Sequence, residues 1–199
     1  MGEIDGFWKW FLANRERLHS SAYNDEALLD EVQEALHLVN ARLAFEIGPP
    51  EPVREFVISA DGLKDFFPSV VSLVSAAPNI PQWKITAFRP RRLLLPSVEL
   101  NGCSVDPEDV SFSLLNKGEI AGIHLFLPNF HEESVTLKQI GYLLLDSALG
   151  EFDVEMNLGP IKMLDVSSPG EFKRYPFSAL PEMFDRLNRR FGRQSVIAH

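Results

Sequence analysis

The sequence predicts an α+β protein with a mostly antiparallel sheet, helices packed on one face of that sheet and an N-terminal helical hairpin. Segments with strand periodicity occur in neighbouring groups, which argues against the regular strand–helix alternation of a doubly wound fold. Hydrophobic residues make up 45% of the 199 residues and charged residues 24%, as in ordinary globular proteins. A chain of this length can bury a full core without disulfides. We therefore expect one domain over residues 1–199, in which the hairpin (1–42) packs on a sheet region (43–199).

The first 42 residues carry two amphipathic helical patterns. Residues 3–19 repeat apolar side chains at helical spacing, and Trp10 lies off that stripe. Asn24 or Asp25 can cap a second helix that extends to about Arg42. Because the connection between them is short, the two helices should form an antiparallel hairpin.

The next segment predicts three strands and one helix. Apolar and polar residues alternate over 43–47, 54–60 and 83–88, which is typical of strands with one buried face. A helix over about 63–77 separates the second strand from the third, with Pro68 near its start.

The second half of the chain predicts further strands and two helices. One helix runs from about Ser134 to Leu149, and Gly150 stands where a C-cap glycine belongs. The last helix covers about residues 179–191. The strands are predicted at 98–100, 110–115, 119–127, 152–156 and 161–166.

The charge balance disfavours several classes of partner. The formal net charge is -9, from 19 Lys and Arg against 28 Asp and Glu. Such a chain repels nucleic-acid backbones and anionic membranes, whereas a basic protein would be attracted. Cys103 is the single cysteine, which excludes an internal disulfide and fits a reducing compartment. The first residues do not resemble a signal peptide, and no apolar run reaches the ~18 residues that span a bilayer. We expect a cytoplasmic protein.

The predicted strand at 152–156 carries the first candidate site. Glu151, Asp153 and Glu155 alternate with apolar residues, so a period of two places the three carboxylates on one side of the strand. This row could dock a basic partner protein. It could also be a solvated face of the sheet, or a pair of carboxylates for cation binding or acid–base chemistry.

A basic cluster carries the second candidate site. Arg89, Arg91 and Arg92 stand close together in an acidic chain, and arginine binds carboxylate or phosphate with two parallel hydrogen bonds. The cluster is a candidate site for an anion or an acidic partner. The alternative is a set of salt bridges to the protein's own acids.

Trp10 is a candidate contact residue on the first helix. If it were exposed beside Phe7 or Phe11, the helix would present an aromatic face to a partner or to a second copy of the chain. The alternative is that these aromatic side chains belong to the core.

Catalytic signals are weak. His124 lies in the middle of a predicted strand and Cys103 lies in a predicted turn, and no helix N-terminus follows that cysteine to activate it. The histidines are scattered, whereas a zinc site needs three or four clustered ligands. The G-x-S-x-G, P-loop and G-x-G-x-x-G patterns are missing. We expect no metal and no cofactor.

Several segments together resemble a group of uncharacterised bacterial proteins of similar length. They are Phe7–Phe11 (FWKWF), Phe45–Gly48 (FEIG), Ile58–Gly62 (ISADG), Ala87–Arg91 (AFRPR) and Leu149–Asp153 (LGEFD). The resemblance implies a bacterial, cytoplasmic origin and carries no activity, cofactor or catalytic residue.

These observations lead to a non-catalytic cytoplasmic protein-binding module with an acidic docking face. One alternative is a small hydrolase-type enzyme that uses His124 and nearby acids. Another is a homodimeric structural protein that pairs through its first two helices.

Overall fold

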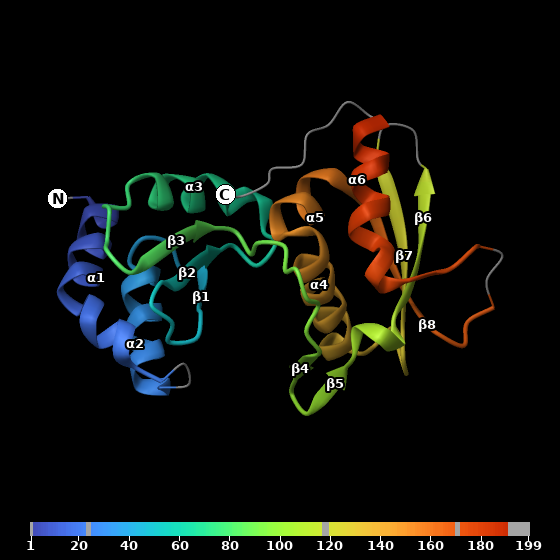
Figure 1. Cartoon of the computed structure of the whole chain (residues 1–199), viewed down its shortest axis with the longest axis horizontal. Helices are drawn as coiled ribbons and strands as arrows, with labels where there is room; N and C mark the ends of the chain where they lie inside the picture. The colour runs from blue at the N-terminus through green and yellow to red at the C-terminus, as the bar shows by residue number, and fades with distance from the viewer. Residues whose placement is uncertain (1, 23–24, 117–119, 170–171, 191–199) are drawn as a thin grey trace. The chain divides into compact units, whose positions relative to one another are not determined.

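The computed structural model describes residues 2–22, 25–116, 120–169 and 172–190. It divides into two compact units, the first ending at Arg89 and the second beginning at Pro90 (Figure 1). Each unit has its own sheet and its own helices. The boundary expected after residue 42 falls inside the first unit.

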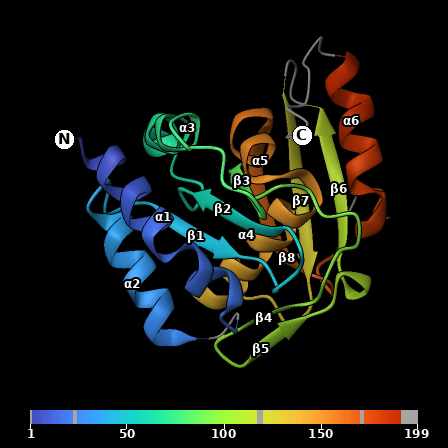
Figure 2. The same cartoon turned by 60° about the vertical axis from the view of Figure 1, so that its left-hand side comes forward.

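The predicted N-terminal helical hairpin is present. Helix α1 spans Glu3–Ser20 and helix α2 spans Glu26–His37, and the two run beside each other (Figure 2). The Asp25 side chain accepts a hydrogen bond from the Leu28 N–H at 3.3 Å, so it caps α2. Asn24, the other expected cap, lies outside the described residues.

The sheet of the first unit has three strands in the order β1-β2-β3. Strand β1 (Ala44–Ile47) is antiparallel to β2 (Arg54–Ser59), and β2 is parallel to β3 (Trp83–Ala87). Helix α3 (Phe67–Ser75) makes the crossover between the parallel strands, after a single 3-10 turn at Lys64–Phe66. Pro68 occupies the first turn of α3, where the N–H that proline lacks is not required.

Aromatic side chains from α1 and the sheet form the core of this unit. The Phe11 ring lies 5.0 Å, centroid to centroid, from both Phe56 and Trp83. The Trp8 indole is also buried, and its Nε1 donates a hydrogen bond to the Leu73 carbonyl at 2.9 Å. The helical stripe predicted for α1 is thus the face that covers the sheet.

A buried arginine ties the sheet to the end of α1. Arg54 is 1% exposed, and its Nη1 donates to the carbonyls of Leu18 (2.6 Å), His19 (3.1 Å) and Ser21 (2.9 Å). Its Nε donates to the Gly48 carbonyl at 2.8 Å. The last carbonyls of a helix lack intrahelical partners and carry partial negative charge, so this guanidinium satisfies and stabilises the C-terminus of α1.

The second unit contains a four-stranded sheet and a separate hairpin. The sheet order is β8-β7-β6-β9, in which β6 is antiparallel to β7 and to β9, and β7 is parallel to β8. The hairpin pairs β4 with β5. The bounds are β4 Val98–Leu100, β5 Cys103–Val105, β6 Ser111–Asn116, β7 Ala121–Leu127, β8 Leu158–Asp165 and β9 Tyr175–Pro176.

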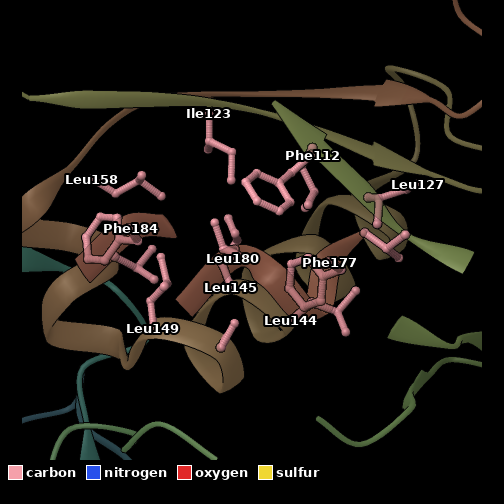
Figure 3. Close-up of a cluster of buried hydrophobic side chains, with 14 of the residues drawn as sticks. Phe112, Ile123, Leu127, Leu144, Leu145, Leu149, Leu158, Phe177, Leu180 and Phe184 are labelled. Atoms are coloured by element: carbon pink, nitrogen blue, oxygen red, sulfur yellow. The ribbon is translucent and has the colours of Figure 1, made fainter. Parts of the chain in front are cut away.

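Helices α4 (Val135–Leu149) and α6 (Leu180–Arg190) pack on one face of the four-stranded sheet. Side chains from the sheet and from these helices meet in the buried core of the unit (Figure 3). The core includes Phe112, Ile123, Leu127, Leu144, Leu145, Leu149, Leu158, Phe177, Leu180 and Phe184. The predicted α+β class, with helices on one face, is confirmed, although the strands are divided among three sheets instead of forming one.

The strand predicted over 152–156 is wrong. Residues Glu151–Asn157 form a short helix, α5, directly after α4. Gly150 separates the two helices with φ +86°, a conformation that side-chain-bearing residues rarely adopt. The Val154 N–H then donates to the Gly150 carbonyl at 3.0 Å, so the chain resumes helical geometry at once. A helix of two turns shows too few apolar positions for its period to be distinguished from strand alternation.

Candidate functional site

The candidate site lies on the outer face of the four-stranded sheet, opposite its core. Side chains alternate between faces along a strand. On β7, Ile123 and Leu125 belong to the buried core, so His124 and Phe126 point to the other face. In the parallel pairing with β8, Lys162 stands opposite His124 and Leu164 stands opposite Phe126. The strand register therefore places cationic, aromatic and aliphatic side chains together.

A groove of about 520 Å³ runs over these residues. It is within the size range of sites that hold a small ligand or a few side chains of a partner. Its lining consists of His124, Phe126, Lys162, Leu164, Ser168, Pro169 and Phe172.

Ser168, Pro169 and Phe172, which are described residues between β8 and β9, form one wall of the groove. The Phe172 ring meets the His124 ring edge to face, with 5.0 Å between centroids and 81° between planes. The Arg174 guanidinium lies 3.7 Å from the centroid of the Phe126 ring, a cation–π contact. Arg174 also donates to the carbonyls of Val166, at 2.7 Å, and Ser168.

The same segment is held against the sheet at two further points. The Ser113 Oγ on β6 donates to the Lys173 carbonyl at 2.8 Å. The Asp165 carboxylate at the end of β8 accepts hydrogen bonds from the Ser167 hydroxyl and N–H, and from the Phe130 N–H at 3.0 Å. The hydrogen bonds from Ser167 hold the pKa of Asp165 below its usual value, and desolvation acts in the opposite direction.

The electrostatic character of the groove is opposite to that of the whole chain. Lys162 is exposed and cationic, and the Arg174 guanidinium borders the groove. Among the described residues that line it, none is aspartate or glutamate. A local cation in a chain of net charge -9 creates a place where an anionic group is attracted.

The carboxylates expected on an exposed strand do not form such a row. Glu151 is 0% exposed and Asp153 is 3% exposed, within α5. Asp153 accepts hydrogen bonds from Asn157 at 2.6 Å and from Arg91 at 3.3 Å. Burial raises the pKa of Asp153, although Asn157 and Arg91 act in the opposite direction. Glu155 is half-buried. These three residues therefore do not form an exposed acidic docking face.

Two of the arginines expected to bind an anion pair with carboxylates of the chain itself. Arg91 makes two parallel hydrogen bonds to Asp185, at 2.9 Å and 2.8 Å, in addition to its contact with Asp153. Arg89 pairs with Glu46 and Asp61. Burial opposes the charge of Arg89, but these two carboxylates hold its pKa above the ordinary value. The exposed Arg92 donates its backbone N–H to the Ser147 carbonyl at 2.8 Å.

Trp10 does not stand in an exposed aromatic face. Phe7 and Phe11 are buried at 3% and 0% exposure, and Trp10 is half-buried with its ring 6.3 Å from that of Phe7. The aromatic side of α1 is a core surface.

Of the two residues considered for catalysis, the groove lining includes His124 but not Cys103. Cys103 is exposed on β5 and is not part of the groove lining. Within the described ranges, no three His, Cys, Asp or Glu residues are placed to hold a metal ion. His124 was identifiable from the sequence, but Lys162 and Phe172 were not, because strand pairing and a loop contact bring them to it.

Of the helices that the structure describes, none is both long and apolar enough to cross a membrane. No protein-family model, curated protein or solved structure matches the chain. The groove on the outer sheet face is the feature from which a function can be argued.

Proposed function

We propose that this protein is a protein-binding module that holds an acidic segment of a partner protein in the groove on the outer face of the β8-β7-β6-β9 sheet. The observation that carries the proposal is the composition of the groove. It combines aromatic walls with an exposed lysine and offers no carboxylate among its described lining residues, in a chain whose net charge is -9.

The lining offers two kinds of contact. Leu164 and Phe172 supply apolar surface on which an aromatic or aliphatic anchor of the partner can pack. Phe126 is 1% exposed, with the Arg174 guanidinium over its ring, and supports the groove from below. Phe172 is 47% exposed, so a bound side chain could cover it further. Lys162 can then pair with a carboxylate beside that anchor, which gives both attraction and orientation.

Binding is better supported than catalysis. In hydrolases a histidine that acts as general base is commonly oriented by a carboxylate and paired with a serine or cysteine nucleophile. The described lining supplies an imidazole, a lysine and a serine, but no carboxylate or thiol. The partner expected from this groove is acidic, the reverse of the basic partner that the net charge alone suggested.

The test is a binding measurement on labelled peptides. Fluorescence polarisation would compare an extended peptide with several Asp and Glu residues around one Phe against two matched peptides, in which the acids are replaced by Gln or by Lys. The proposal expects saturable binding of the acidic peptide and weaker binding of the other two. Binding that is equal for all three peptides, or absent, would contradict it.

Two variants locate the binding on the protein. Lys162→Glu reverses the cation in the groove, and Lys138→Glu makes the same change at an exposed position on α4, which lies on the opposite side of the sheet. The affinity for the acidic peptide should fall about tenfold or more in the first variant only. Thermal unfolding of both variants checks that each remains folded.

A further inference from the structure

A second pocket, independent of the groove, lies within the first unit. It has a volume of about 480 Å³ and is bounded by α1 on one side and by the segment that leads into β3 on the other. Helix α1 contributes residues 12, 15, 16 and 19, which share one helical face because they lie three, four and seven positions apart.

The bottom of this pocket is apolar. Ile80 is 3% exposed and Trp83 is 9% exposed, and the half-buried Leu12 faces them from α1. An apolar side chain of a ligand would lose water contact here and gain an aromatic surface.

The rim of the pocket carries both signs of charge. The Arg15 Nη2 lies 3.4 Å from the Glu16 Oε1, and the two side chains are 48% and 88% exposed. An exposed ion pair of this kind contributes little stability, so either group can exchange its partner for a ligand at low cost. Asn79 and Gln82 add exposed amide groups to the same rim.

His19 adds a buried polar atom at the pocket wall. Its Nε2 is buried and has no hydrogen-bond partner among the described residues. Its ring stands edge to face against Trp83, with 5.7 Å between centroids and 82° between planes. A buried nitrogen without a protein partner is normally satisfied by water or by a ligand.

The segment that closes the pocket has a fixed shape. Gln82 has φ +67°, a left-handed conformation that is uncommon for a residue with a side chain. Its carbonyl accepts a hydrogen bond from the Arg54 N–H at 2.8 Å, which anchors it to β2. This hydrogen bond and the hydrogen bonds of α1 hold the backbone on both sides of the pocket in place, which limits the ordering that a ligand must impose.

We propose that this pocket binds a free α-amino acid with an apolar side chain. Such a molecule carries an ammonium and a carboxylate on one carbon, so it can present one to Glu16 and the other to Arg15 while its side chain enters the apolar bottom. An anion alone would use only one of the two rim charges, and an apolar molecule would use neither. The inference does not depend on the groove in the second unit.

The experiment is a titration followed by NMR of the full chain. L-phenylalanine and L-leucine are the probes, with N-acetyl-L-phenylalanine and L-phenylalaninamide as forms that lack the ammonium charge or the carboxylate. The readout is the indole N–H signal of Trp83 together with the backbone signals of α1. The free amino acids should shift these signals in a saturable way, and each blocked form should bind about tenfold more weakly.

Four variants test the two charges. Arg15→Gln and Glu16→Gln should each weaken binding of L-phenylalanine about tenfold. Arg42→Gln and Glu34→Gln make the same changes at exposed positions elsewhere in this unit and should leave binding unaltered. In addition, Glu16→Gln should have little effect on the N-acetyl form, which has no ammonium to lose.

Three results would overturn the proposal. The first is the absence of any shift at about 10 mM ligand, where a site with a dissociation constant near 1 mM would be mostly filled. The second is a shift that is the same for free and blocked forms, which would mean that only apolar contact is recognised. The third is a set of shifted signals that lies outside α1 and the 79–83 segment, which would place the binding elsewhere.

Discussion

Lys162 on β8 stands opposite His124 on β7 in the parallel register of the second sheet. The pairing places a cation and an imidazole next to each other on the face that the core helices leave open. Phe172 then reaches the same histidine from the chain between β8 and β9. Residues from three segments thereby form one surface, on which the proposed binding of an acidic peptide depends.

Truncation of Phe172 should weaken peptide binding without loss of the fold. Its ring is 47% exposed and forms a wall of the groove. Phe172→Ala therefore removes contact area with the bound peptide but little of the protein's own core packing. We expect a loss of affinity of about 1–2 kcal/mol, measured by fluorescence polarisation. Tyr142→Ala, at a similarly exposed aromatic residue on α4, is the control. Equal effects of the two changes would argue against the groove.

Removal of the buried arginine should destabilise the first unit. Arg54 donates four hydrogen bonds to backbone carbonyls that include the last ones of α1. Arg54→Met keeps much of the volume but leaves these buried acceptors without their donor, so the free energy of unfolding should fall by about 3 kcal/mol. Urea denaturation would measure it. As a control, Arg42→Met at an exposed position should change the free energy of unfolding by less than about 0.5 kcal/mol. A similarly small effect of Arg54→Met would show that the carbonyls find other donors.

The glycine between α4 and α5 should not tolerate a side chain. Gly150 has φ +86°, so Gly150→Ala is strained and should cost about 1–2 kcal/mol of stability. Gly6→Ala is the matched control, because Gly6 lies inside α1 and an added methyl group meets nothing within 4 Å. That change should be neutral or stabilising. A neutral result at position 150 would indicate that α4 and α5 can join in another geometry.

The stability of the second unit should depend on the ionisation of Asp165. Its pKa in the folded protein lies below the usual value because Ser167 and the Phe130 N–H donate hydrogen bonds to the carboxylate. The stabilisation is therefore present above the pKa of the unfolded chain, about 4, and is lost as the pH falls through the lower folded value. Urea denaturation between about pH 6 and pH 3 should show a smaller decline for Asp165→Asn than for the unaltered protein. Identical declines would contradict this role.

The parts of the fold that depend on local pattern were predictable from sequence. The stripes of α1, α2 and α4 repeat over several turns, and the strands β1, β2, β3 and β7 show alternation or continuous apolar runs. Helix α5 was not predictable, because charged and apolar residues alternate over its two turns after Gly150, as they do in a strand. The candidate site could be predicted from the sequence only in part, for a different reason. The sequence singles out His124, but the pairing of β7 with β8 is a long-range choice that no local pattern specifies.

The arginine cluster shows the same dependence on long-range contacts that the sequence does not reveal. Arg89, Arg91 and Arg92 formed a recognisable cluster, yet the acids that meet two of them are distant in sequence, such as Asp185 opposite Arg91. Whether a charge is exposed or internally paired depends on tertiary contacts. The sequence could therefore raise both alternatives for the cluster but could not choose between them.

The most direct test of the central claim compares the affinity of one acidic, phenylalanine-containing peptide for Lys162→Glu and for Lys138→Glu by fluorescence polarisation. The account predicts that the Lys162 variant loses affinity about tenfold or more while the Lys138 variant binds like the unaltered protein. If both variants bound the peptide equally well, the groove on the outer sheet face would not be the binding surface.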